Sequence, residues 1–205
     1  MEITIEQIKE LRERTGAGVG AVKEALEHAQ GDNDKAIQYL REKGLAKAAK
    51  RAGKQADNGV LGIYVHGDNR MSVIVEVATE TDFAARSEDV RKFANDIALH
   101  IAANEVQYAS VENIPEDIIE SEKATFAADV AGKPAEIAEK IIAGKLEKFY
   151  ADNVITYQTL FTDETKTVQD YMNELVAKVG EKIEITRFVK IKIAAPANSC
   201  GLNIA

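Results

Sequence analysis

The chain has 205 residues, of which 45% are hydrophobic and 29% charged, and its formal net charge is -8. This composition is that of an ordinary globular protein and excludes a disordered or fibrous chain, and the apolar runs are too short to span a bilayer. The single cysteine, Cys200, excludes an intramolecular disulfide and a cysteine-based zinc site.

The first 45 residues are predicted to form a compact bundle of three short helices. The stretch from Thr4 to Gln7 has the form of a capping box, and apolar residues then recur at helical spacing up to Leu11. Two further apolar stripes indicate the second and third helices, one made of Val19, Val22, Leu26 and Ala29 and the other of Ala36, Ile37 and Leu40. The third helix is expected to end before Gly44.

A glycine-rich stretch, "TGAGVGA" at residues 15–21, meets the spacing of a dinucleotide-binding fingerprint. That fingerprint requires a strand before the glycines, whereas the pattern here predicts a helix. We therefore interpret Gly16 as the residue that ends the first helix in a left-handed conformation. Gly18 and Gly20 then let the chain turn tightly into the second helix.

A basic segment follows the bundle. Six basic residues and one acid lie between Arg41 and Lys54, and residues 46–56 are predicted to be a linker. A solvated connecting face explains this composition, and a contact strip for an acidic protein surface or for RNA is the alternative. The overall negative charge argues against general affinity for nucleic acid.

The rest of the chain is predicted to be an α+β domain, because helices and antiparallel-looking strands occur in blocks without regular βαβ alternation. The expected elements are strands at 60–65 and 71–78, helices at 90–101, 116–129 and 134–149, a strand at 154–161, a helix at 167–179 and a strand at 183–193. The predicted domains are a helical domain at 1–45, the linker at 46–56, an α+β core at 57–197 with its antiparallel sheet packed on helices, and a tail at 198–205.

The sequence offers little for covalent chemistry. The three histidines, His28, His66 and His100, lie far apart and none has metal-ligand spacing with another histidine or a cysteine. Motifs typical of serine hydrolases, zinc proteases and phosphate-binding loops are absent. We expect no catalytic residues, no bound metal and no cofactor, although distant residues that converge in space would not be seen in this way.

One connection stands out, the stretch "ETDFAAR" that begins at Glu80 and follows the strand at 71–78. An aromatic residue next to a carboxylate on a connection is typical of a recognition site. In the alternative interpretation, Thr81 or Asp82 caps a turn and Phe83 fills the core beneath it.

Several long motifs then match a known family in the right order. They are "IKELRERTGAGV" with "VKEALEHAQGDNDKAIQYLREKGLAKAAKRAG", "VEVATETDFAARSEDVRKFA", "KPAEIAEKIIAGKLEKFYADN" and "GEKIEITRFVKIKI". Over essentially its whole length the chain resembles bacterial elongation factor Ts in a short form. The resemblance implies a guanine-nucleotide exchange factor for elongation factor Tu in translation elongation, located in the cytoplasm and without enzymatic chemistry.

The resemblance also implies a site. The N-terminal bundle would be a ubiquitin-associated-like domain that docks on the GTPase domain of the partner, through Arg12, Thr15, Gly16, Ala17, Gly18 and Val19. The loop with Thr81, Asp82, Phe83 and Ala84 would be inserted near the partner's Mg²⁺ site, with Phe83 as a wedge. The factor would then promote GDP release and stabilise nucleotide-free elongation factor Tu until GTP binds, with no direct contact to nucleic acid or membrane.

The chain departs from the family pattern at two points. Family members often have "GAGMMDCKKAL" where this chain has "GAGVGAVKEAL", so Val19 and Gly20 make a smaller apolar tip. Some short members are dimers linked through a cysteine in the last strand, where Val189 stands here, so no covalent dimer is carried over. A homodimer or a 2:2 complex with the partner is left open. A passive binding module, an RNA-binding protein that uses residues 41–54, and an unrecognised enzyme are the rival interpretations.

Overall fold

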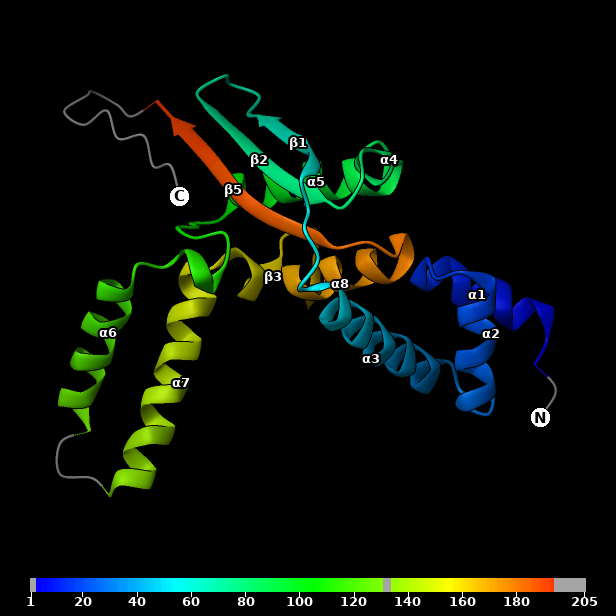
Figure 1. Ribbon diagram of the computed structural model, residues 1–205, viewed down its shortest axis with the longest axis horizontal. Coiled ribbons are helices and arrows are strands. Elements are labelled where there is room, and N and C mark those ends of the chain that lie inside the picture. The colour runs from blue at the N-terminus through cyan, green and yellow to red at the C-terminus, as the bar shows by residue number, and fades with distance from the viewer. Residues whose placement is uncertain (1–2, 131–133, 194–205) are drawn as a thin grey trace. The chain divides into compact units, whose positions relative to one another are not determined.

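The computed structural model describes residues 3–130 and 134–193 (Figure 1), so the predicted tail at 198–205, with Cys200, lies outside the described residues. The chain forms two compact units. Unit 1 consists of Met1–Val60, Ala78–Val90 and Asp170–Glu184, and unit 2 consists of Leu61–Val77, Arg91–Gln169 and Ile185–Ala205. The fold class is α+β, as predicted.

Three helices, α1 (Ile5–Thr15), α2 (Val19–His28) and α3 (Asn33–Arg51), form the N-terminal bundle of unit 1. The predicted capping box is present, because Thr4 accepts from the Gln7 N–H while the Gln7 side chain accepts from the Thr4 N–H. The bundle core consists of Leu11, Val22, Ala25, Leu26, Ala29 and Ala36. Burial of these small and branched aliphatic side chains holds three helices together that would be marginal on their own.

The prediction that the third helix ends before Gly44 is wrong, because α3 continues through Gly44 to Arg51. Gly44 is buried, and a Cβ at this position would lie 3.5 Å from both the Ala177 Cβ and the Asn173 backbone oxygen. The glycine therefore lets α3 pack closely against α8 (Val168–Val179), and that tertiary contact outweighs the low helix propensity of glycine. Part of the predicted linker is helical as a result.

A three-stranded sheet with the order β1-β2-β5 is formed by β1 (Asn58–Val65), β2 (Met71–Thr79) and β5 (Ile183–Lys192). Helix α5 (Glu88–Ala103) begins after Ser87, whose hydroxyl accepts from the Val90 N–H at 3.3 Å. In unit 2 this helix packs very closely on β1, since a Cβ at Gly62 would lie 2.0 Å from the Ala94 oxygen. A glycine is required there by the close approach of the two backbones.

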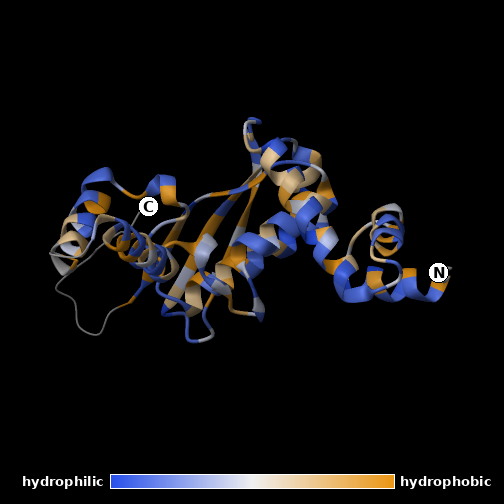
Figure 2. Ribbon diagram, turned by 90° about the horizontal axis from the view of Figure 1, so that it is seen from below, coloured by the Kyte–Doolittle hydropathy of each residue, from blue (hydrophilic) through white to orange (hydrophobic). Residues whose placement is uncertain are grey.

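The large aliphatic side chains of β1 lie on the open side of the strand. Leu61, Ile63 and Val65 are exposed, whereas Gly62 is buried. In Figure 2 the strands are predominantly hydrophobic, and the helices show hydrophilic and hydrophobic bands. The strand itself was predicted correctly, and its strongest apolar residues remain available for contact.

Helices α6 (Glu116–Asp129) and α7 (Ala135–Asn153) confirm the two helices predicted around Pro134 and pack against each other in unit 2. Three short elements had no counterpart in the predictions: the single helical turn α4 (Asp82–Ala85), the 3₁₀ turn η1 (Val111–Asn113) and the strand β4 (Asp163–Thr167). Among the residues placed by the structure, no helix is long and apolar enough to cross a membrane.

The predicted strand at 154–161 is wrong. The segment contains the 3₁₀ turn η2 (Ile155–Tyr157) and a two-residue strand, β3 (Thr159–Leu160), which pairs antiparallel with β4. Val154 and Ile155 are fully buried, and the Ile155 N–H donates to the Tyr108 oxygen. The apolar run is thus buried by folding back on unit 2, and burial in a turn leaves the same sequence pattern as burial in a strand.

A buried histidine fixes this turn. His100 in α5 has no exposed surface, its Nε2 lies 2.9 Å from Gln158 Oε1, and its Nδ1 accepts from the Phe161 N–H at 3.1 Å. The Gln158 amide is oriented because its Nε2 donates to the backbone oxygens of Glu105 and Asp152. The ring is therefore neutral with its proton on Nε2.

Candidate functional site

The predicted recognition loop is a single helical turn that presents Phe83 to solvent. Helix α4 begins after Thr81, whose hydroxyl accepts from the Ala84 N–H at 3.2 Å. Because α4 completes one turn, Ala84 and Ala85 point inward and are 2% and 5% exposed, whereas Phe83 is 82% exposed. Thr81 does cap a turn, but Phe83 does not fill the core.

Asp82 lies beside Phe83 on the exposed side of the turn. Its carboxylate forms an ion pair with Arg86 at 2.9 Å, and both side chains are mostly exposed. An exposed pair four residues apart contributes little to stability, so this carboxylate is free to exchange partners at small cost. The loop thus offers one aromatic ring and one carboxylate side by side.

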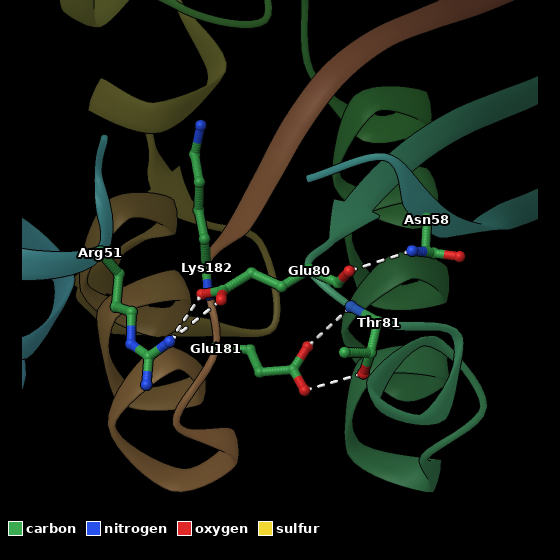
Figure 3. A network of polar contacts seen from close by, with 6 residues as sticks. All are labelled: Arg51, Asn58, Glu80, Thr81, Glu181 and Lys182. Carbon is green, nitrogen blue, oxygen red and sulfur yellow. Dashed lines mark hydrogen bonds and ion pairs between the residues drawn. The ribbon is translucent and has the colours of Figure 1, made fainter. Parts of the chain in front are cut away.

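Polar contacts hold the start of the loop in place (Figure 3). The Glu80 carboxylate accepts from the Lys182 N–H at 2.7 Å, and both of its oxygens accept from the Arg51 Nη1 group, at 3.1 and 3.0 Å. The Glu80 backbone oxygen accepts from the Asn58 amide. The hydrogen bond from the Lys182 N–H lowers the pKa of Glu80, and the charge of Arg51 acts in the same direction.

Thr81 is held by a second carboxylate. Glu181 accepts from the Thr81 N–H at 3.0 Å and from its hydroxyl at 2.8 Å. The Thr79 hydroxyl donates to the Thr81 oxygen at 2.7 Å. Every polar backbone group of Thr81 therefore has a partner, and the turn that carries Phe83 is fixed at its first residue.

The predicted docking residues surround the connection between α1 and α2. Gly16 ends α1 with φ +67°, and its N–H donates to the Arg12 oxygen at 2.8 Å. The Thr15 hydroxyl donates to the Leu11 oxygen and accepts from the Ala17 N–H. The left-handed conformation predicted for Gly16 is confirmed.

The exposed part of this connection is small. Val19 is 52% exposed and Arg12 is exposed, whereas Thr15 is half-buried and Ala17 packs against the bundle core. Gly18 precedes α2 with no side-chain cap. Of the predicted docking residues, Arg12 and Val19 are those whose side chains are best placed to meet a partner.

Both predicted segments belong to unit 1, where Lys178 of α8 lies near the connection between α1 and α2 and near the start of α5. Lys178 forms an ion pair with Asp89 at 2.6 Å, and its Nζ lies 3.9 Å from where a Cβ at Gly16 would stand. Sequence reasoning missed Glu181 and did not connect Arg51 with Glu80. No local pattern could have shown these contacts, since Glu181 lies 100 residues from Thr81.

Comparison with known proteins gives a consistent result. Residues 4–175 match the family model described as Elongation factor TS. Elongation factor Ts of Acetivibrio thermocellus is 50% identical over 192 residues, which cover 93% of this chain and 89% of the relative. The namesakes from Moorella thermoacetica and Fervidobacterium nodosum are 48% and 46% identical, over 93% and 94% of this chain and 95% and 99% of theirs. The chain therefore belongs to the elongation factor Ts family and is an elongation factor of protein biosynthesis.

Proposed function

We propose that the chain is the guanine-nucleotide exchange factor of elongation factor Tu and acts in the cytoplasm. It binds the GDP-bound partner, promotes GDP release, and stabilises the nucleotide-free state until GTP binds. No covalent bond is made or broken, so its effect depends on a difference in affinity between two states of the partner. Membership of the elongation factor Ts family supports this proposal.

The observation that carries the mechanism is the exposure of Phe83. A phenylalanine that is 82% exposed, on a turn whose neighbouring residues are buried or hydrogen-bonded, contributes almost nothing to its own fold. In our proposal Thr81, Asp82, Phe83 and Ala84 enter the partner next to its Mg²⁺ site, and the ring of Phe83 is the wedge.

The free energy gained by burying the Phe83 ring can be compared with the preference that nucleotide exchange requires. Shifting a two-state site from 1:99 to 99:1 requires a preference of about 5.5 kcal/mol. Burial of a phenylalanine supplies about 1.5–3 kcal/mol, and only where the receiving pocket opens in the nucleotide-free state. Phe83 therefore provides part of the preference, and further state-dependent contacts must provide the rest.

Asp82 is the polar companion of Phe83 in this mechanism. Mg²⁺ requires near-ideal octahedral coordination by oxygen atoms. A nearby carboxylate disturbs this coordination shell when it attracts hydrogen bonds, or when it draws away a group that holds one of the oxygen ligands. The Asp82 side chain is mostly exposed and pairs with Arg86, so its carboxylate can contact the partner instead of Arg86 without the loss of a buried contact. We assign it a role in dislodging the ion.

The bundle supplies anchoring. The predicted docking set, with Arg12 and Val19 as its most exposed members, contacts the GTPase domain in both nucleotide states. Binding energy that is equal in the two states raises affinity and leaves the preference between them unchanged. The bundle and the Phe83 loop thus have separable effects.

Release of a fluorescent GDP analogue from purified elongation factor Tu tests the wedge. With Phe83→Ala we expect the stimulated release rate at saturating factor to fall at least about tenfold, since loss of about 1.4 kcal/mol of the preference corresponds to that factor. Phe161→Ala is the matched control, because Phe161 is also more than half exposed and lies in unit 2. Equal release rates for both variants and wild type would exclude the wedge.

The same assay separates anchoring from exchange. Val19→Asp should raise the concentration of factor needed for half-maximal release while leaving the maximal rate unchanged. Ile137→Asp in α7 makes the same change at a similarly exposed position, 49% against 52% for Val19, and should do neither. A fall in the maximal rate alone would show that position 19 acts on the exchange step and not on docking.

We also propose that the open face of the sheet in unit 2 pairs two copies of the chain, which allows a 2:2 complex with the partner. Leu61, Ile63 and Val65 of β1, Ile74 of β2 and Ile191 of β5 are between 40% and 56% exposed. The adjacent Glu76 and Arg187 neutralise each other, so a second copy brings no net charge against this face. Such a self-complementary patch fits a two-fold symmetric dimer.

Sedimentation velocity tests the pairing. Wild type should sediment as a dimer at micromolar concentration, and Ile63→Lys should sediment as a monomer. Ile137→Lys introduces the same charge elsewhere in unit 2 and should leave the dimer intact. A wild-type chain that is monomeric over the accessible concentration range contradicts the proposal.

A further inference from the structure

The turn that carries Phe83 is too short to hold its own shape. Helix α4 comprises only Asp82–Ala85, and a single turn fixes several backbone dihedrals for very few hydrogen bonds. Phe83 itself packs against little, since it is 82% exposed. The orientation of the ring must therefore be set by contacts from other parts of unit 1.

Those contacts come from the connection between α8 and β5, at Gly180, Glu181 and Lys182. Gly180 has φ +80°, and its N–H donates to the Val176 oxygen, so it ends α8 in the left-handed conformation and lets the chain reverse. The following two residues then reach the Phe83 loop. The Glu181 side chain binds the Thr81 backbone and hydroxyl, and the Lys182 backbone binds the Glu80 side chain.

The two contacts of Glu181 have a specific effect on Thr81. The Thr81 hydroxyl has one proton, and it donates this proton to Glu181 Oε1 at 2.8 Å. Its lone pairs are then directed to the Ala84 N–H, which is the capping bond of α4. Glu181 Oε2 also binds the Thr81 N–H. The two contacts therefore restrict both the backbone dihedrals of Thr81 and the rotation of its hydroxyl.

We infer that Glu181 is a positioning residue for nucleotide exchange, which holds Thr81 so that Phe83 is presented in its inserting orientation before the partner is met. The inference rests on the proposed function of the Phe83 loop. A carboxylate suits this role because its two oxygens accept from the Thr81 N–H and from the Thr81 hydroxyl at the same time. A loop that is already ordered loses less conformational entropy when it binds the partner, and this difference appears as faster GDP release.

The test compares Glu181→Gln with Glu184→Gln in the GDP-release assay. Glutamine keeps the size of Glu181 but offers one acceptor oxygen in place of two, so it cannot accept from the Thr81 N–H and from the Thr81 hydroxyl at the same time. Glu184 lies three residues further on, in β5, and pairs with the side chain of Lys182. We expect release by E181Q to be about tenfold slower, as small misplacements of a positioned group cost up to about a hundredfold, and release by E184Q to be unchanged.

A second pair of variants shows whether Glu181 acts through Phe83. Adding E181Q to F83A should slow release no further, because there is no ring left to position. If the two losses multiply, Glu181 acts by another route and the inference is overturned. If F83A slows release but E181Q behaves like E184Q, the wedge stands and only the positioning role fails.

Amide hydrogen exchange supplies a readout that does not depend on activity. The peptide that covers residues 80–86 should exchange about tenfold faster in E181Q than in E184Q, while the peptides of α2 should not change. Equal protection in the two variants would overturn the positioning role even if Phe83 proved to have no part in exchange. The urea midpoints of the two variants should agree, since both positions are on the surface of unit 1.

Discussion

Two polar clusters of the molecule hold a turn in place, one in each unit, and they differ in their access to solvent. In unit 1, the Glu181 carboxylate binds Thr81 at the start of the Phe83 loop, where water competes for the same groups. In unit 2, the neutral His100 and Gln158 fix the turn after α7 with no exposed surface on the imidazole. The first cluster holds the turn that presents Phe83 to solvent, whereas the second cluster stabilises only the fold of unit 2.

The comparison separates two uses of polar groups. A buried hydrogen-bond network is costly to break because its members lose partners that water cannot replace. An exposed network contributes little net free energy, yet it still restricts orientation. We therefore expect changes in the His100 cluster to lower stability, and changes in the Phe83 loop to lower exchange.

Among changes in the two clusters, His100→Ala should have the largest effect on stability. This change leaves a cavity and removes the partners of the Phe161 N–H and of Gln158. We expect the free energy of unfolding to fall by about 3 kcal/mol, measured by urea denaturation. His66→Ala should stay within about 0.5 kcal/mol of wild type, because His66 is exposed. Similar urea midpoints for the two variants would show that the His100 cluster is not the stabilising one.

The pH dependence of stability sharpens the contrast. Burial lowers the pKa of His100 from its ordinary value of 6.5, and the hydrogen bond to Gln158 opposes this shift only in part. Because the unfolded chain then binds a proton more readily than the folded one, stability is full above pH 6.5 and falls as the pH drops towards the folded pKa. The loss is at most about 1.4 kcal/mol for each pH unit in that window.

His100→Gln removes the titrating group and should flatten stability as the pH falls below 6.5, although the variant is less stable than wild type at pH 7.5. Urea denaturation at a series of pH values measures this slope. His28→Gln makes the same substitution at an exposed position in α2 and serves as the matched control. A slope that persists in H100Q would assign the pH dependence to other groups.

A weaker effect at lower pH is expected from Glu80. Its pKa is lowered from 4.5, chiefly by the hydrogen bond from the Lys182 N–H and then by the charge of Arg51. Its contribution to stability is present above pH 4.5 and is lost as the pH falls through the lower folded value. Glu80→Gln should thus flatten stability only below pH 4.5. As the pH is lowered, the His100 cluster should therefore begin to lose its contribution to stability before Glu80 does.

Much of the fold could be predicted from sequence because its determinants are local. The capping box at Thr4, the left-handed Gly16 and the alternation in β5 each depend on a few neighbouring residues. The course of α3 through Gly44 could not be predicted, because it depends on packing against α8. The run at 154–161 was misread for the same reason, since its burial is provided by distant residues such as Tyr108.

The candidate site shows the same division. The pattern around Phe83 and the family resemblance indicated the loop, but residue types alone left open whether the ring was buried. Inward-facing Ala84 and Ala85 decide this in the structure, and alanine is too small to dominate a hydropathy pattern. Glu181 could not be identified from the sequence, because no pattern distinguishes one surface glutamate from another until its partner, 100 residues away, is known.

The smallest effect on stability is the most informative for function. Phe83→Ala should change the free energy of unfolding by no more than about 0.5 kcal/mol, because the ring is 82% exposed and leaves no cavity when removed. Phe93→Ala in α5 supplies the opposite limit, since Phe93 has no exposed surface and its truncation empties a core position. Urea denaturation of the two variants measures the difference.

A phenylalanine retained at that exposure has to be explained by something other than folding, because exposed aromatic surface favours association with other molecules. If F83A unfolds at the same urea concentration as wild type and also releases GDP slowly, the lost activity belongs to the ring itself. If F83A is destabilised as strongly as F93A, the ring packs within unit 1 in solution, and slow release would then reflect a damaged loop. The two measurements together decide whether the exposed network exists to present this side chain.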